Sequence, residues 1–287
     1  MATIKQLTNE IEDMGTFGDL TRVYGEVALT RMNRVRAEVL ANRRFLEQLK
    51  GVFAQVQAAY LKQLAVKAGA NRRTPKQERI SVLQHNGMTV MVLLSANMRL
   101  YGDILRRTFA TFMQAVHQER CEATIVGKVG LTMFKEEMGL APVTYFDFPD
   151  DRVDRKLLGE IINHLVQYER VVIWYPRFRN VIKQEPVELS ISAQQPMGQV
   201  APTLTQAFHF EPSLEAVMAF FEREIFATFL EQTIREAQLS KFAARAMSMD
   251  RAQETISNKK QQLVSKRRLV VKEINNKRQV NLMPAYL

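Results

Sequence analysis

The sequence predicts an α/β fold combined with a long coiled coil, in which helices from the two ends pair antiparallel and carry an inserted Rossmann-like α/β domain. Three observations support this fold class. Near the N-terminus, apolar residues recur at spacings of three and four. Near the C-terminus, an apolar residue occurs at every seventh position. Between these two segments, short apolar runs alternate with helical stretches. The predicted boundaries are 1–65 for the N-terminal coiled-coil helix, 66–208 for the inserted domain with its flanking linkers, and 209–287 for the C-terminal coiled-coil helix.

The N-terminal helix is predicted from a continuous seam of apolar and small residues in a stretch without proline. Gly18 and Gly25 belong to this seam. Glycine costs a helix roughly 1 kcal/mol relative to alanine, so we expect a second backbone to come close at these positions. The seam consists of Ile4, Leu7, Ile11, Met14, Gly18, Thr21, Gly25, Ala28, Met32 and Val35, and is predicted to continue through Phe45, Leu49, Val52, Phe53, Val56 and Tyr60.

The C-terminal helix is predicted to be opened by Pro212 and Ser213 and to run to about residue 285, a length of about 110 Å at 1.5 Å per residue. Its apolar stripe is narrow, because the companion positions are only partly apolar. We therefore expect a two-helix coiled coil with a mostly polar outer surface. The residues that repeat every seven positions are Phe242, Met249, Ile256, Leu263 and Val270.

The middle of the chain predicts a mainly parallel sheet with helices on its faces, because strand-like and helical stretches alternate there. Helices are expected at about 100–118, 131–138 and 152–168. Strands are expected at 88–95, 123–129, 143–148, 171–175 and 187–191.

Composition excludes several classes of protein. An apolar content of 46% and a charged content of 24% are those of a folded water-soluble protein, and no run approaches the ~18 apolar residues of a membrane span. The first residues lack the apolar core of a signal peptide, and the single Cys121 fits a reducing compartment. We therefore expect a cytoplasmic location.

The positive charge is concentrated at the C-terminal end. Residues 251–287 hold nine lysines and arginines against two glutamates, which accounts for seven of the ten excess positive charges. Such a segment favours an anionic partner, which could be nucleic acid, anionic lipid or an acidic protein surface.

No catalytic, cofactor or metal site is predicted. Gly127-Lys128 is the nearest candidate for a phosphate-binding loop, but Glu122 and Val129 occupy the positions that such a loop needs as glycine and Ser/Thr. The four histidines are scattered without metal-ligand spacing. Four aspartates cluster after a predicted strand, where a metal is conceivable, but a solvated turn with a helix N-cap is favoured. They are Asp147, Asp150, Asp151 and Asp154.

Several segments together resemble the γ subunit of F-type ATP synthases, the central rotor shaft, from the N-terminal helix to the C-terminal helix. Each motif alone is weak, but their order and placement match the family. The loop after the first strand, SANMRLYG at 95–102, and the basic C-terminal tail depart from the family pattern, which indicates a divergent member. The matching segments are LTR at 20–22, VALTRMNR at 27–34, YPRFRN at 175–180, QEP at 184–186, FEPS at 210–213 and AARAMSMDRA at 243–252.

The resemblance implies a non-catalytic subunit without cofactors, which transmits torque between a membrane ring of c subunits and a catalytic hexamer of α and β subunits. It further implies that the ε subunit and the c-ring bind at the foot, at the cytoplasmic side of a membrane, to which the chain is peripheral. Leu100, Tyr101 and Gly102 are predicted as foot-domain contacts. Torque or partner contacts are predicted for Arg22, Arg31, Arg245, Arg251, Lys266, Arg267 and Arg268, and the last five of these could engage an acidic loop of the β subunits.

The sequence leaves two alternatives open. The basic coiled coil could belong to a nucleic-acid-binding or scaffold protein, although Tyr286 is the only aromatic residue of the basic segment that could stack on bases. The α/β domain could instead bind a nucleotide as an enzyme, although it lacks a phosphate-binding loop.

Overall fold

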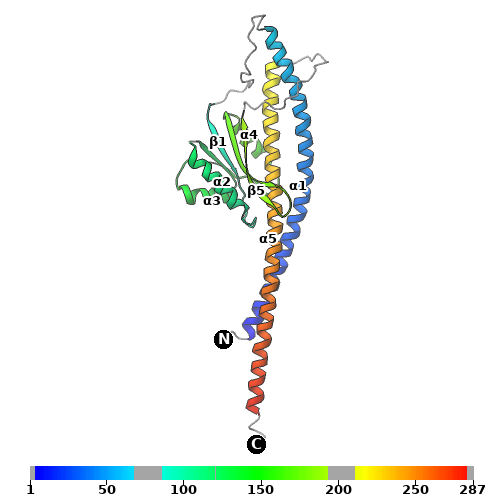
Figure 1. Cartoon of the computed structure of the whole chain (residues 1–287), viewed down its shortest axis with the longest axis vertical. Coiled ribbons are helices and arrows are strands. Elements are labelled where there is room, and N and C mark those ends of the chain that lie inside the picture. The colour runs from blue at the N-terminus through cyan, green and yellow to red at the C-terminus, as the bar shows by residue number, and fades with distance from the viewer. Residues whose placement is uncertain (1–3, 68–85, 120, 193–210, 283–287) are drawn as a thin grey trace.

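The computed structural model describes residues 4–67, 86–119, 121–192 and 211–282. Two long helices lie side by side, and an α/β domain is attached to one side of the pair (Figure 1). The predicted fold class is confirmed. Most of the polar linkers on either side of the inserted domain lies outside the described residues.

The two long helices run antiparallel. Helix α1 spans Ile4–Lys67 and helix α5 spans Leu214–Leu282, so that α5, at 1.5 Å per residue, is about 100 Å long. Successive contacts between the helices join higher-numbered residues of α1 to lower-numbered residues of α5. Phe53 lies 6.2 Å from Phe221 between ring centroids, Asn42 donates to Gln232 at 3.1 Å, and Gly25 lies against Met249.

The seam of α1 keeps a seven-residue repeat through Met32, Val39, Leu46 and Phe53, all of which are buried. The expected continuation through Phe45 and Val52 is wrong, because both side chains are about half exposed. Those two residues lie one position before the repeat, which rotates them away from α5.

The inserted domain contains one five-stranded sheet in the order β3-β2-β1-β4-β5. The first four of these strands are parallel to their neighbours, and β5 is antiparallel to β4, so the sheet is mainly parallel as predicted. The strands are β1 Thr89–Leu94, β2 Glu122–Val126, β3 Thr144–Phe146, β4 Arg170–Phe178 and β5 Gln184–Ser192.

Helices cover both faces of this sheet. On one face, α2 (Ile104–Gln118) and α3 (Lys128–Met138) pack Phe112 and Phe134 against Trp174 and the alternate residues of β1 and β2. On the other face, α4 (Arg155–Leu165) and the middle of α5 pack against the remaining residues of the strands. Helix α5 therefore belongs both to the coiled coil and to a layer of the α/β domain.

This double role divides α5 into two parts. Residues 237–246 are all buried, between α1 on one side and the α/β domain on the other. From 250 to 280, Leu263 is the only buried residue. Within the described ranges, no helix is long and apolar enough to span a membrane.

Candidate functional site

The end of the coiled coil that lies away from the α/β domain is here called the tip and comprises residues 4–30 of α1 and 250–282 of α5. The C-terminal end of α5 extends beyond the first turn of α1 (Figure 1). The helices approach closely at the glycines: a Cβ placed on Gly25 would lie 3.4 Å from the Cβ of Met249, and one on Gly18 would lie 3.7 Å from Ile256. The close approach expected at these glycines is confirmed.

The tip carries most of the cations that were predicted to face a partner. Arg251, Lys266 and Arg268 are exposed and Arg267 is half-buried, and no ion pair to another described residue holds them. Arg22 is exposed and pairs with Asp19 at 2.7 Å within one turn of α1, a surface pair of small energetic value. These side chains are therefore free to meet carboxylates from another subunit.

Arg31 and Arg245 are held within the chain. Arg31 lies 3.8 Å from Asp151 and 5.9 Å from the centre of the Phe242 ring. Arg245 is buried, donates from Nη2 to the carbonyl oxygen of Arg99 at 3.1 Å, and has its guanidinium carbon 4.2 Å from the centre of the Tyr101 ring. Because its guanidinium is enclosed by this chain, Arg245 is not exposed to a partner.

The outer surface of α1 at the tip is not polar as expected. Five large apolar side chains there are between 44% and 54% exposed, and they fall within one broad face of the helix, turned away from α5. The prediction of a mostly polar outer surface is wrong for this stretch. A contiguous exposed apolar surface on a folded protein usually marks a binding surface. This α1 stripe consists of Phe17, Leu20, Val23, Tyr24 and Val27.

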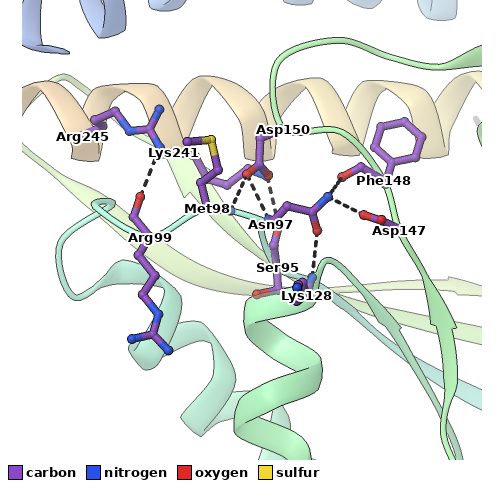
Figure 2. Close-up of polar contacts among 10 residues, drawn as sticks. All are labelled: Ser95, Asn97, Met98, Arg99, Lys128, Asp147, Phe148, Asp150, Lys241 and Arg245. Carbon is purple, nitrogen blue, oxygen red and sulfur yellow. Dashed lines mark hydrogen bonds and ion pairs between the residues drawn. The ribbon is translucent and has the colours of Figure 1, made fainter.

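A second polar site, here called the junction, lies where the loop 95–102 and Asp150 meet α5 (Figure 2). Lys241 projects from α5, with its Nζ 2.9 Å from Oδ1 of Asp150 and 3.0 Å from the carbonyl oxygen of Ser95. Oδ2 of Asp150 accepts from the backbone N–H groups of Asn97 and Met98, both at 2.9 Å. The buried carboxylate and ammonium are thus both paired and hydrogen-bonded.

The predicted foot contacts fall in the junction loop. Leu100 is exposed and has a positive φ of 75°, a strained conformation for this residue. Tyr101 is fully buried, and burial together with the negative charge of Asp150 raises the pKa of its hydroxyl. A Cβ on Gly102 (φ 62°) would lie 2.9 Å from Oγ of Ser248 on α5, so this loop packs closely against α5. Of the three residues, Tyr101 is not accessible to another subunit.

The α3 N-terminus and the aspartate cluster have structural roles. The side-chain oxygen of Asn97 accepts from the backbone N–H of Lys128 at 2.8 Å. This bond uses an N–H group at the start of α3, where the candidate phosphate loop would bind its ligand. Asp154 caps α4 as predicted, by accepting from the N–H groups of Lys156 and Leu157. Asp150 is buried, so a solvated turn is the wrong description for it. No group of metal-ligand type occurs among the residues that the structure describes; His85 and His209 lie outside them.

Sequence reasoning missed the junction, because Lys241 and Asp150 are 91 residues apart and each is unremarkable in its local pattern. The available signal was the composition of residues 237–244, where small and apolar residues occur on every face of a helix that was expected to be mostly polar. This pattern is typical of a helix that is buried all round.

The sequence was compared with protein families and with known proteins. The family model for ATP synthase matches residues 3–279. The chain is 24% identical to the ATP synthase gamma chain of Roseobacter denitrificans, over 88% of this chain and 87% of that one, and 23% identical to that of Paraburkholderia phymatum, over 96% and 97%.

Solved structures agree in fold. A chain of the Tetrahymena thermophila mitochondrial ATP synthase central stalk and c-ring has a TM-score of 0.54 at 16% identity, covering 81% of this chain and 99% of that chain. A chain of the Euglena gracilis mitochondrial ATP synthase has a TM-score of 0.54 at 14% identity, covering 89% and 93%. Nothing in these comparisons supports the nucleic-acid-binding or scaffold alternative.

Proposed function

Because the chain belongs to the ATP synthase gamma-chain family, we propose that it is the central-stalk rotor of an F-type ATP synthase or ATPase, transmitting torque between a membrane c-ring and a catalytic α/β hexamer. The observation that carries the proposal is the division of α5. One part is fixed between α1 and the α/β domain, and the other continues as a slender, mostly exposed shaft.

The tip is suited to turning inside a ring of other subunits. Its two helices are held together by a narrow seam, so most of each helix surface is available to surroundings that change as the shaft rotates. Exposed arginines pair with carboxylates in solvent for about 1 kcal/mol or less, which permits contacts to form and break. We propose that Arg22, Arg251, Lys266, Arg267 and Arg268 meet the acidic loop of successive β subunits.

The α1 stripe adds an apolar component to these contacts. At about 25 cal/mol per Å², burial of 100 Å² of apolar surface is worth about 2.5 kcal/mol, which is enough to bias a contact without fixing it. We propose that α and β subunits cover this stripe in the assembled complex. Arg31, at the upper end of the same surface, has its charge partly compensated by Asp151 and is the weaker candidate for a torque contact.

The α/β domain is proposed as the foot of the rotor, with the ε subunit and the c-ring as its partners. Leu100 and Gly102 are the accessible candidates for these contacts, since both are exposed. The subunit itself is proposed to be non-catalytic, because the start of α3 is occupied by Asn97 rather than left open for a phosphate. We place it at the cytoplasmic side of a membrane, to which it is attached through the complex.

The assembly can be tested by purifying the tagged full-length chain from its native cells. We expect α-, β-, ε- and c-type subunits to accompany it, together with Mg-ATP hydrolysis. Recovery of the chain without α- and β-type subunits would overturn the proposed function.

The torque contacts can be tested by reversing charge in the double variant Arg267→Glu, Arg268→Glu. We expect slower ATP-driven rotation of the subcomplex of α, β and this chain under load. Arg106→Glu with Arg107→Glu makes the same change of charge on the exposed face of α2, outside the tip, and should rotate normally. Equal torque in both variants would remove the tip cations from the mechanism.

A further inference from the structure

The α/β domain is attached to α5 by two kinds of contact. One is an apolar cluster, in which Leu230, Ile234 and Ala237 of α5 lie against the sheet and α4. The other is polar. It consists of the junction and of two hydrogen bonds nearer the start of α5, from Tyr175 of β4 to Glu236 at 3.3 Å and from Arg223 to Asn163 of α4. Apolar burial is non-directional, so the cluster favours close packing without specifying one rotation of the domain about the helix. Directional contacts are needed to fix that rotation.

The Lys241–Asp150 pair supplies directional contacts in a dry environment. The two side chains are only 8% and 7% exposed, and the two residues are 91 positions apart in the sequence. Lys241 also donates to Ser95 at the end of β1, and Asp150 also accepts from the loop backbone at Asn97 and Met98. Lys241 of α5 therefore bonds to two separate segments of the α/β domain.

The neighbouring turns of α5 contact the same loop. Lys241, Arg245 and Ser248 are spaced four and three residues apart, which places them on one face of the helix. Arg245 bonds to Arg99 and stacks on Tyr101, and Ser248 lies directly against Gly102. The loop 95–102 is thus held along two turns of α5, as Figure 2 shows for Lys241 and Arg245.

We infer that the Lys241–Asp150 pair is the principal rotational link between the α/β domain and α5, and that it prevents the domain from swivelling about α5 when torque is applied. The domain lies to one side of the coiled coil (Figure 1), so a force on it reaches α5 through these contacts. Both residues act as positioning residues. The role in torque rests on the proposed function, whereas the fixing of the domain does not.

The link can be tested in the reconstituted membrane complex with three variants, Lys241→Met, Asp150→Asn and the double variant. The double variant removes both charges and leaves neither ion buried alone, so it separates loss of the link from loss of folding. We expect ATP hydrolysis to persist while protons pumped per ATP fall roughly threefold or more in all three variants. Normal pumping by the double variant would overturn the torque role.

Arg43→Gln provides the matched control. Arg43 pairs with Glu236 at 2.8 Å and joins α1 to α5 near the same level. Glu236 also accepts from Tyr175 of β4, and the Arg43 substitution leaves both of these groups in place. Its loss should leave protons pumped per ATP unchanged. An equal fall in this control would show that any weakened pair in the shaft has the same effect, which would also overturn the inference.

The fixing of the domain can be tested on the full chain without partners. With Cys121→Ser as background, spin labels at Lys135→Cys on α3 and Asp250→Cys on α5 report the distance between domain and shaft. We expect one narrow distribution for the wild type and for Arg43→Gln, and a distribution roughly twice as wide for the Lys241 and Asp150 variants. Equal widths throughout would overturn the inference even if the complex assembles. A wild-type chain that gives a narrow distribution but recruits no α or β subunits would instead contradict the proposed function, and with it the torque role.

Discussion

Two stretches of the same helix, residues 237–246 and 250–280 of α5, differ in how deeply their side chains are buried and in which elements lie beside them. The first has ten consecutive buried residues, including a lysine and an arginine, whereas the second buries only Leu263. The first has α1 on one side and a sheet on the other. The second has only α1 beside it, and near its end not even that (Figure 1).

The difference shows how one continuous helix can be anchored at one level and free to interact at another. Helical backbone bonds are the same in both stretches, so the contrast depends only on how much of the circumference is covered. Substitutions that remove similar atoms should therefore have effects that depend on their level along α5. Two of the four predictions that follow test this dependence, and the other two test the attachment of the sheet to α5 and the exposed face of α1.

The largest effect is expected in the covered stretch. Phe242 is 1% exposed and packs against Met32, Val35 and Val39 of α1. Phe242→Ala should lower the free energy of unfolding by about 3–5 kcal/mol, because it removes an aromatic side chain from a site that cannot collapse freely. Urea denaturation followed by circular dichroism measures this. A loss below about 1 kcal/mol would show that the covered stretch is packed no better than the tip.

A smaller effect is expected from Leu263, the one buried residue between 250 and 280 of α5. Leu263→Ala should cost about 2 kcal/mol, the low end for such substitutions, because surrounding side chains at an exposed seam can move into the space. The same denaturation experiment measures it, preferably with local hydrogen exchange at the tip. A cost as large as that of Phe242→Ala would contradict the contrast between the two stretches.

Alkaline pH should weaken the attachment of the sheet to α5. Tyr175 donates to Glu236 of α5 at 3.3 Å, and burial together with the negative charge of Glu236 raises the pKa of Tyr175 to about 12. An unfolded tyrosine has a pKa of about 10, so between about pH 10 and 12 the unfolded chain loses a proton that the folded chain retains. This contribution is fully present below about pH 10 and is lost as pH rises through that window.

We expect this single group to account for roughly 1–2 kcal/mol of the stability lost across the window. Urea denaturation of the wild type and of Tyr175→Phe at pH 8 and pH 11 provides the measurement, and the phenylalanine variant should lose less stability on going to pH 11. An identical loss in both proteins would show that the Tyr175 hydroxyl does not contribute.

The smallest effect on stability is expected in the α1 stripe. Leu20 is half exposed, so Leu20→Gln should change the free energy of unfolding by less than about 0.5 kcal/mol. Its effect should appear only on assembly, as weaker association with α and β subunits. Leu29→Gln is the control, because Leu29 is similarly exposed but lies on a different face of α1. Equal association of the two variants would remove the stripe from the interface.

Much of the fold followed from periodicity, because coiled-coil seams and strand–helix alternation are local patterns. The mistake at Phe45 and Val52 has a local cause. Both are large and apolar and lie next to true seam residues, so spacing alone favoured Phe45 over Leu46 and added Val52 beside Phe53. Only the unbroken seven-residue repeat from Met32 to Phe53 distinguishes the buried set.

The junction could not be predicted in the same way. A lysine and an arginine on a long helix indicate solvent exposure unless something covers them, and the cover here comes from a loop 146 residues earlier. The pairing of Lys241 with Asp150 is a tertiary fact that no local pattern encodes. The predicted torque contacts of the tip concern other chains and remain predictions.

The place of α5 in the α/β domain has a consequence for synthesis of the chain. One face of the sheet, with Val90, Val92 and Ile173, is completed by Leu230, Ile234 and Ala237, which are translated after every strand. While residues 86–192 leave the ribosome, α4 alone is present to cover that face. The domain must therefore wait for the last quarter of the polypeptide to close its core, and its folding ends together with pairing of the two long helices rather than before it.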